Sequence, residues 1–209
     1  FSDDIVYDTT GPLGGVTIDP APLSATTTLT LNLYASDGRG VPSMSLSFNG
    51  AAFSAWQAYT PTYVWSVGTA FATHTVQVKY RDSLLNESAV FSATTCVDTT
   101  APTTPVVTDD GDYSPFLDKL HASWTSSDAQ TGIAYSLVRV GTAQGLADVV
   151  PETNVGNVTE YTFSDLTLDL SGATQYYFTV YTVNAVGGKS LPGYSNGIKG
   201  GDPTPPDPF

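Results

Sequence analysis

A short linker-like motif recurs along this chain at intervals close to the length of one β-sandwich. Asp8-Thr9-Thr10-Gly11-Pro12 is followed by Asp98-Thr99-Thr100-Ala101-Pro102 and then by Asp202-Pro203-Thr204-Pro205-Pro206. Proline lacks a backbone N–H and fixes φ, so a proline soon after an Asp-Thr-Thr run ends a strand and stiffens the segment that follows. A repeat with this period predicts an array of modules of about 100 residues each.

Between the first two motifs, apolar and polar side chains alternate with a period of two. The positions on one face are Leu29, Leu31, Leu33 and Ala35, then Met44, Leu46 and Phe48, then His74, Val76, Val78 and Tyr80. Such alternation gives each strand one apolar face. Asn49-Gly50 predicts a tight turn after the second run. We therefore expect six or seven short strands in this block, the last opening at Val90, and no helix.

The block after the second motif repeats the pattern with other residues. The alternating runs are Leu120, Ala122 and Trp124; Tyr135, Leu137 and Arg139 against Ser136, Val138 and Val140; Tyr161 and Phe163; and Tyr176, Phe178, Val180 and Thr182. Residues 184–188 are expected to form a loop, and Tyr194 to Ile198 a closing strand. Strands with one apolar and one polar face are typical of antiparallel sandwiches.

These patterns predict an all-β chain of two tandem antiparallel β-sandwiches. The expected boundaries are 8–98 and 99–199. Residues 1–7 are interpreted as the last strand of a preceding domain or an N-terminal arm, because Ile5-Val6-Tyr7-Asp8 lines up with Thr95-Cys96-Val97-Asp98. Residues 200–209 have the composition of a Pro-rich linker. We interpret the chain as a piece of a longer one, in contact with neighbouring domains of that chain.

Charge and cysteine content exclude several classes of function. The chain has 20 Asp and Glu against seven Lys and Arg, a net charge of −13. Scattered cations do not neutralise a run of phosphates, so nucleic acids and anionic membrane surfaces are poor partners. No stretch approaches the roughly 18 to 20 apolar residues of a membrane helix. The single Cys96 excludes an internal disulfide and thiolate-metal sites; we interpret it as a strand residue or as a thiol that pairs between molecules.

The second block resembles a fibronectin type III domain. The likeness lies in residues 120–124, residues 135–141, Tyr161-Thr162-Phe163 before Leu166, and residues 176–184. The resemblance implies that Trp124 packs in the middle of the core and that Tyr176 hydrogen-bonds across the corner before its strand. Family members usually place Gly three residues before this tyrosine, whereas Gly172 is four before Tyr176. The alternation favours Tyr176 over Tyr177.

The first block is similar to the immunoglobulin-like repeats of bacterial secreted and surface proteins. The likeness lies in Ser36-Asp37-Gly38, residues 44–50, Phe53 to Trp56 with Tyr59, and Val76 to Asp82 with Asn86 and Ser88. It implies an extracellular, multi-domain setting, secreted or at the cell surface. It implies no particular activity, because a scaffold of this kind hosts many functions.

One loop is a candidate metal site. Asp109, Asp110 and Asp112 surround Gly111, and closely spaced oxygen ligands suit calcium. Asp98 could approach the same loop. The alternative is a solvated acidic turn. The two histidines, His74 and His121, lie in different blocks without a nucleophile pattern beside them, so no catalytic site is predicted.

Two further patterns have both a binding and a structural interpretation. Trp56, Tyr59, Tyr63 and Trp65 could form a flat platform for stacking against sugars, or could fill the core. Asn86-Glu87-Ser88 and Asn157-Val158-Thr159 match the glycosylation acceptor pattern, which also arises by chance.

The expected function is that of a non-catalytic extracellular structural or adhesive module, a spacer, stalk or fibre subunit of a bacterial surface or secreted protein. The alternatives are accessory modules of a secreted polysaccharide-degrading enzyme and a calcium-stiffened adhesin. Self-association into fibres, or binding of a glycan or surface ligand, is expected under these interpretations. The residues expected to hold the cores are Leu31, Phe48, Trp56 and Val78 in the first block, and Trp124, Leu166 and Tyr176 in the second.

Overall fold

The computed structural model describes residues 7–68 and 71–201, which contain β-strands and no α-helix. None of these residues therefore belongs to a helix that is long and apolar enough to cross a membrane. The chain divides between Thr99 and Thr100 into two compact units. Most of the segment expected to close a preceding domain and nearly all of the expected Pro-rich linker lie outside the described residues.

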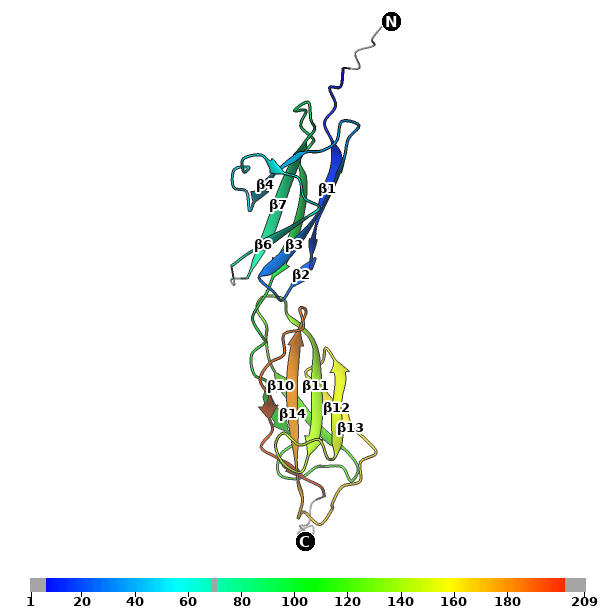
Figure 1. The fold of residues 1–209 in the computed structure, drawn as a ribbon. Helices are drawn as coiled ribbons and strands as arrows, with labels where there is room; N and C mark the ends of the chain where they lie inside the picture. The colour runs from blue at the N-terminus through cyan, green and yellow to red at the C-terminus, as the bar shows by residue number, and fades with distance from the viewer. Residues whose placement is uncertain (1–6, 69–70, 202–209) are drawn as a thin grey trace, which may run out of the picture. The chain divides into compact units, whose positions relative to one another are not determined.

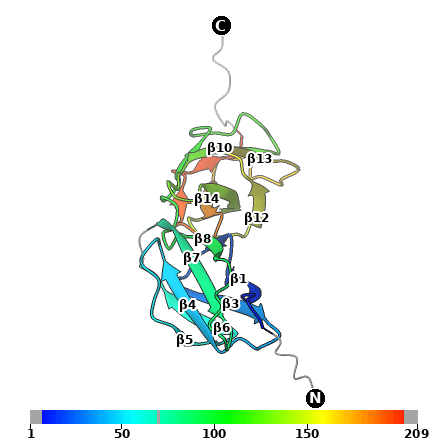
Figure 2. The ribbon, with the colours of Figure 1, turned by 90° about the horizontal axis from the view of Figure 1, so that it is seen from above.

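The first unit has two facing sheets (Figures 1 and 2). One contains β1 (Leu13–Asp19), β3 (Thr28–Ser36) and β6 (Thr62–Ser66), in the order β1-β3-β6. The other has the order β2-β8-β7-β4-β5, with β2 (Leu23–Ser24), β4 (Ser43–Phe48), β5 (Gln57–Ala58), β7 (Ala72–Arg81) and β8 (Phe91–Val97). Neighbouring strands are antiparallel except β2 and β8. The expectation of six or seven strands missed β1 and the two-residue strands.

The core of the first unit follows the predicted alternation. Leu31 of β3 and Val78 of β7 are fully buried, and Phe48 packs against the same cluster. The fully buried Tyr80 donates its hydroxyl to the carbonyl of Gly15 at 2.6 Å, and burial raises the pKa of Tyr80. A Cβ on Gly14 would lie 2.9 Å from the Tyr80 ring and 2.4 Å from a backbone oxygen of β3. Glycine in β1 therefore lets this ring approach the strand closely.

One prediction for the first unit is wrong, and one buried polar face was not predicted. Trp56, expected in the core, lies half-buried outside it, with the Arg81 guanidinium carbon 3.9 Å from the centre of its ring. Ser45 and Ser47, on the polar face of β4, are also buried. The Ser45 hydroxyl donates to the carbonyl of Ser54 at 2.7 Å and that of Ser47 to Ala51 at 2.5 Å. The segment after the Asn49-Gly50 turn thus covers the outer face of β4.

The second unit also has two sheets (Figure 1). The first has the order β13-β10-β9, with β9 (Val106–Asp109), β10 (Leu120–Thr125) and β13 (Glu160–Phe163). The second has the order β12-β11-β14-β15, with β11 (Ile133–Gly141), β12 (Val150–Gly156), β14 (Gln175–Asn184) and β15 (Gly193–Tyr194). β16 (Ile198–Lys199) also pairs with β14. The single closing strand expected at 194–198 is therefore two short pieces.

The core of the second unit is built around Trp124, which is 3% exposed. Its indole N–H donates to the buried Ser136 hydroxyl at 3.1 Å. Tyr176 is buried in the same cluster, and Leu166 packs against that cluster while partly buried. The Tyr176 hydroxyl accepts the backbone N–H of Asp169 at 2.7 Å. This is the expected corner bond, and it confirms Tyr176 over Tyr177 as the corner tyrosine.

Trp124→Ala is expected to destabilise the second unit by about 3 to 5 kcal/mol, because it removes a large buried side chain and leaves a cavity. Urea denaturation of the full chain, followed by backbone NMR signals assigned to each unit, measures the loss. Val158→Ala, at an exposed position, serves as the control. A loss below about 1 kcal/mol for Trp124→Ala would show that this side chain is not central to the core.

Tyr176→Phe is expected to cost about 1 kcal/mol, since it removes the corner hydrogen bond and leaves the ring in place. Tyr177→Phe is the matched control: its hydroxyl donates only to the Gln175 side chain, on a partly exposed face. The same denaturation experiment compares the two variants. Equal losses of stability would contradict the assigned corner.

Candidate functional site

Two of the three aspartates around Gly111 use their carboxylates for separate partners. The Asp109 carboxylate is buried and accepts the backbone N–H groups of Gly197 at 3.0 Å and Gly111 at 3.3 Å. Asp110 lies 2.7 Å from Nδ1 of His121. In the part of the chain that the structure describes, Asp109, Asp110 and Asp112 do not form a group close enough to share a metal ion. Asp98 is buried in the first unit. Calcium binding by this loop therefore stays a prediction without support from the geometry.

A different set of carboxylates comes together in the first unit. Oxygen atoms of Asp8, Asp37 and Asp82 all lie within 4.8 Å of one another, and among the described residues no other such group of three occurs. Asp8 lies in the first linker motif, Asp37 follows β3, and Asp82 follows β7. Sequence reasoning missed this set because its members are far apart along the chain. The available signal was that two of the three directly follow long predicted strands.

Local donors orient each of these carboxylates. Asp82 is fully buried; its Oδ1 accepts the N–H groups of Leu84 and Asn86, and its Oδ2 accepts the Asn86 side-chain amide, each at 2.8 Å. That amide also donates to the carbonyl of Asp8 at 3.1 Å. Asp37 accepts the N–H of Arg39 at 2.7 Å. The arrangement holds three acidic side chains at one end of the sandwich.

Asp8 is held in its ionised form. Its Oδ1 accepts the backbone N–H of Thr10 at 3.0 Å and the Thr10 hydroxyl at 2.8 Å. Both hydrogen bonds lower the pKa of Asp8, and the bond from the backbone N–H has the larger effect. At neutral pH three neighbouring carboxylates repel one another, and a bound cation offsets that repulsion.

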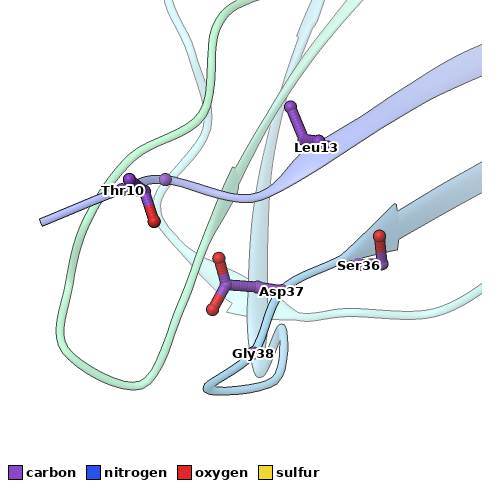
Figure 3. A pocket seen from close by; sticks show the side chains of 6 residues that line it. Thr10, Leu13, Ser36, Asp37 and Gly38 are labelled. Atoms are coloured by element: carbon purple, nitrogen blue, oxygen red, sulfur yellow. The ribbon is translucent and has the colours of Figure 1, made fainter. Parts of the chain in front are cut away.

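An open depression lies beside the cluster. It has a volume of about 520 Å³ and is lined by Thr10, Gly11, Leu13, Ser36, Asp37 and Gly38. Figure 3 shows the Asp37 carboxylate directed toward the segment that carries Thr10. Asp37 is thus the member of the cluster that lines this depression. Carboxylate and carbonyl oxygens with water are the ligands that calcium takes, six to eight in number.

Comparisons with known proteins identify the fold. No family model matches the chain, and no curated protein matches it. Among solved structures, domains A168-A170 from titin match with a TM-score of 0.54 at 18% identity, over 90% of this chain and 62% of that one. The chain has the fold of immunoglobulin and fibronectin type III modules.

Two other solved structures are similar at lower TM-scores. They are the fibronectin(III)-like modules of CbhA from Clostridium thermocellum, at 15% identity and 0.49, and the FN1-FN3 domains of chicken CNTN1, at 16% and 0.43. This chain is covered to 90% and 87%, and those chains to 95% and 66%. The chain therefore spans less than two thirds of the titin structure and about two thirds of the CNTN1 structure.

The immunoglobulin fold explains why most of the four aromatic residues fill the core and do not form a platform. In such a sandwich, large side chains from both sheets fill the core. Trp65 is 8% exposed and belongs to the core, and Tyr59 and Tyr63 pack against it. The Tyr59 hydroxyl donates to the carbonyl of Leu33 at 3.0 Å. These three rings therefore help to fill the core, which was the structural interpretation of the aromatic pattern.

Trp56 alone of the four lies on the outer side of the second sheet, within a group of charged side chains. Nζ of Lys79 lies 5.6 Å from the centre of the Trp56 ring, on which Arg81 also stacks. Glu87 accepts hydrogen bonds from Lys79 at 2.9 Å and from Arg81 at 2.5 Å. Both hydrogen bonds lower the pKa of Glu87, and the bond from Lys79 has the larger effect. The group ties the 51–58 segment to β7.

The remaining candidates have structural surroundings. His74 is buried, with Nδ1 3.2 Å from the Asn49 side-chain amide. Two asparagines match the glycosylation pattern. The side-chain amide of Asn86 is hydrogen-bonded in the carboxylate cluster, whereas Asn157 is exposed. Cys96 is a half-buried free cysteine on β8.

Proposed function

We propose that this chain is a non-catalytic structural or adhesive part of a larger extracellular protein, a spacer, stalk or fibre subunit of a bacterial surface or secreted protein. The observation that carries the proposal is that each unit packs a separate hydrophobic core. The Asp-Thr-Thr motif before a proline precedes the first strand of the first unit and spans the boundary between the two units, and such a segment is suited to joining units in series. The net charge of −13 favours solubility of such a chain.

The rival function, accessory modules of a secreted polysaccharide-degrading enzyme, requires a sugar-binding surface. Three of the four aromatic rings that suggested one contribute to the core. Trp56, partly exposed and stacked on Arg81, is the remaining ring. This distribution favours the structural role over the accessory one.

Affinity gel electrophoresis separates the two functions. The chain is expected to migrate equally in gels with and without soluble cellulose derivatives, xylan or β-glucan, because three of the four candidate rings contribute to the core. The comparison includes Trp56→Ala and, as a matched control, Tyr161→Ala on the exposed face of the second unit. Retardation of the wild-type chain that Trp56→Ala removes and Tyr161→Ala preserves would overturn the structural role in favour of the accessory one.

A second candidate function, a calcium-stiffened adhesin, is favoured by the cluster of Asp8, Asp37 and Asp82. In this proposal calcium binds the three carboxylates and fixes the first linker motif to the loops after β3 and β7. The fully buried Asp82, already held by three hydrogen bonds, provides a pre-oriented ligand. The expected benefit is a stiffer junction at the start of the first unit.

Calcium is expected to raise the melting temperature of the first unit. A ligand at 100 times its Kd stabilises the native state by about 2.7 kcal/mol. Asp37→Asn should remove the effect, and in EDTA it should be at least as stable as the wild type, since it also removes repulsion. Asp110→Asn with Asp112→Asn is the matched control in the second unit.

Calorimetry with calcium, magnesium and EDTA reads out these outcomes. Loss of the calcium effect in the control and not in Asp37→Asn would place the ion at the 109–112 loop. A melting temperature that does not respond to calcium in any variant would reject the calcium function.

A further inference from the structure

The strand β6 is an open edge of the first unit. It pairs antiparallel with β3 on one side, and in the described residues no strand pairs with its other side. In the constant-type immunoglobulin fold the equivalent sheet has four strands, whereas here it has three (Figure 1). An edge of this kind presents N–H and C=O groups that another strand can pair with.

The β6 edge lacks the residue types and register shifts that protect many edges from pairing. Thr62-Tyr63-Val64-Trp65-Ser66 contains no charged residue, proline or glycine, and its register with β3 has no shift. The other described edge strands longer than two residues carry such features: Gly14-Gly15 and Asp19 in β1, Asp109 at the end of the four-residue β9, Pro151, Glu152 and register shifts in β12, and Glu160 in β13. β6 is thus the unprotected edge among them.

The charge pattern singles out the same region. Residues 40–78 contain no Asp, Glu, Lys or Arg, although the whole chain has a net charge of −13. A second copy meets like charge over much of the molecule but not along β6. The exposed side chains of this strand are the polar Thr62 and Ser66 and, between them, the apolar Val64, which is 64% exposed, while Trp65 faces the core.

We propose that two copies of the chain associate through antiparallel pairing of β6 with β6. An antiparallel strand pair has a two-fold axis, so one edge pairs with itself. With Val64 at the axis, Thr62 of one copy lies opposite Ser66 of the other. Pairing joins the two β1-β3-β6 sheets into one continuous sheet. The five-residue contact is small, so the complex is weak and reversible.

This association builds on the proposed structural function and gives it a lateral contact between chains. Either can fail alone. A monomeric chain that does not bind glycans would leave the spacer function intact and remove only the β6 contact.

Sedimentation velocity over a concentration series tests the pairing. The wild-type chain is expected to show a reversible monomer–dimer equilibrium. Val64→Lys places two like charges opposite each other at the axis and should weaken the dimer by about tenfold or more. Val106→Lys is the matched control, because Val106 is 67% exposed on the edge strand β9. It should dimerise like the wild type.

Two further measurements make each outcome decisive. Melting curves of both lysine variants check folding, which both exposed positions should tolerate. Backbone NMR of the wild type should show concentration-dependent shifts at residues 62–66. A wild type that stays monomeric throughout the series, or a dimer that Val106→Lys disrupts and Val64→Lys does not, would overturn the β6 contact.

Discussion

Two β-sheets with one apolar face each must bury those faces against each other, and this requirement positions the rest of both units. In the first unit Leu31 and Val78 come from opposite sheets and belong to one core cluster, and in the second Trp124 and Phe178 do so. The loops then gather at the two ends of each sandwich. β3 ends at Ser36 and β7 ends at Arg81, so Asp37 and Asp82 are the first residues after these strands. Both lie close to Asp8 at one end of the first sandwich.

Much of the core could be predicted because its signal is local. A strand with a period of two shows its buried face in any stretch of five residues, as in β3, β7 and β14. The corner tyrosine was also accessible, since alternation with Phe178 distinguishes Tyr176 from Tyr177. The double glycine hid β1, because Gly14 and Gly15 contribute no apolar side chain although Val16 and Ile18 do.

What could not be predicted depends on contacts between residues far apart in sequence. Ser45 and Ser47 look like solvent-facing residues, but the segment after Asn49 folds back and covers them. Trp56 looks like a core residue, but it lies on that segment and stacks on Arg81. The same reason explains why the sequence pointed to a different acidic cluster. The aspartates around Gly111 are close together in the sequence, whereas Asp8 and Asp82 come close together only in the fold.

The distribution of charge constrains association more than its total does. At physiological ionic strength, charges more than about 8 Å apart are largely screened. Repulsion between two copies therefore depends on the residues next to the contacting edge. Edges that carry Glu152 or Glu160 repel a copy of themselves, whereas the uncharged segment 40–78 contributes no such repulsion along β6. A chain with a net charge of −13 can thus remain soluble and still offer one edge to a second copy.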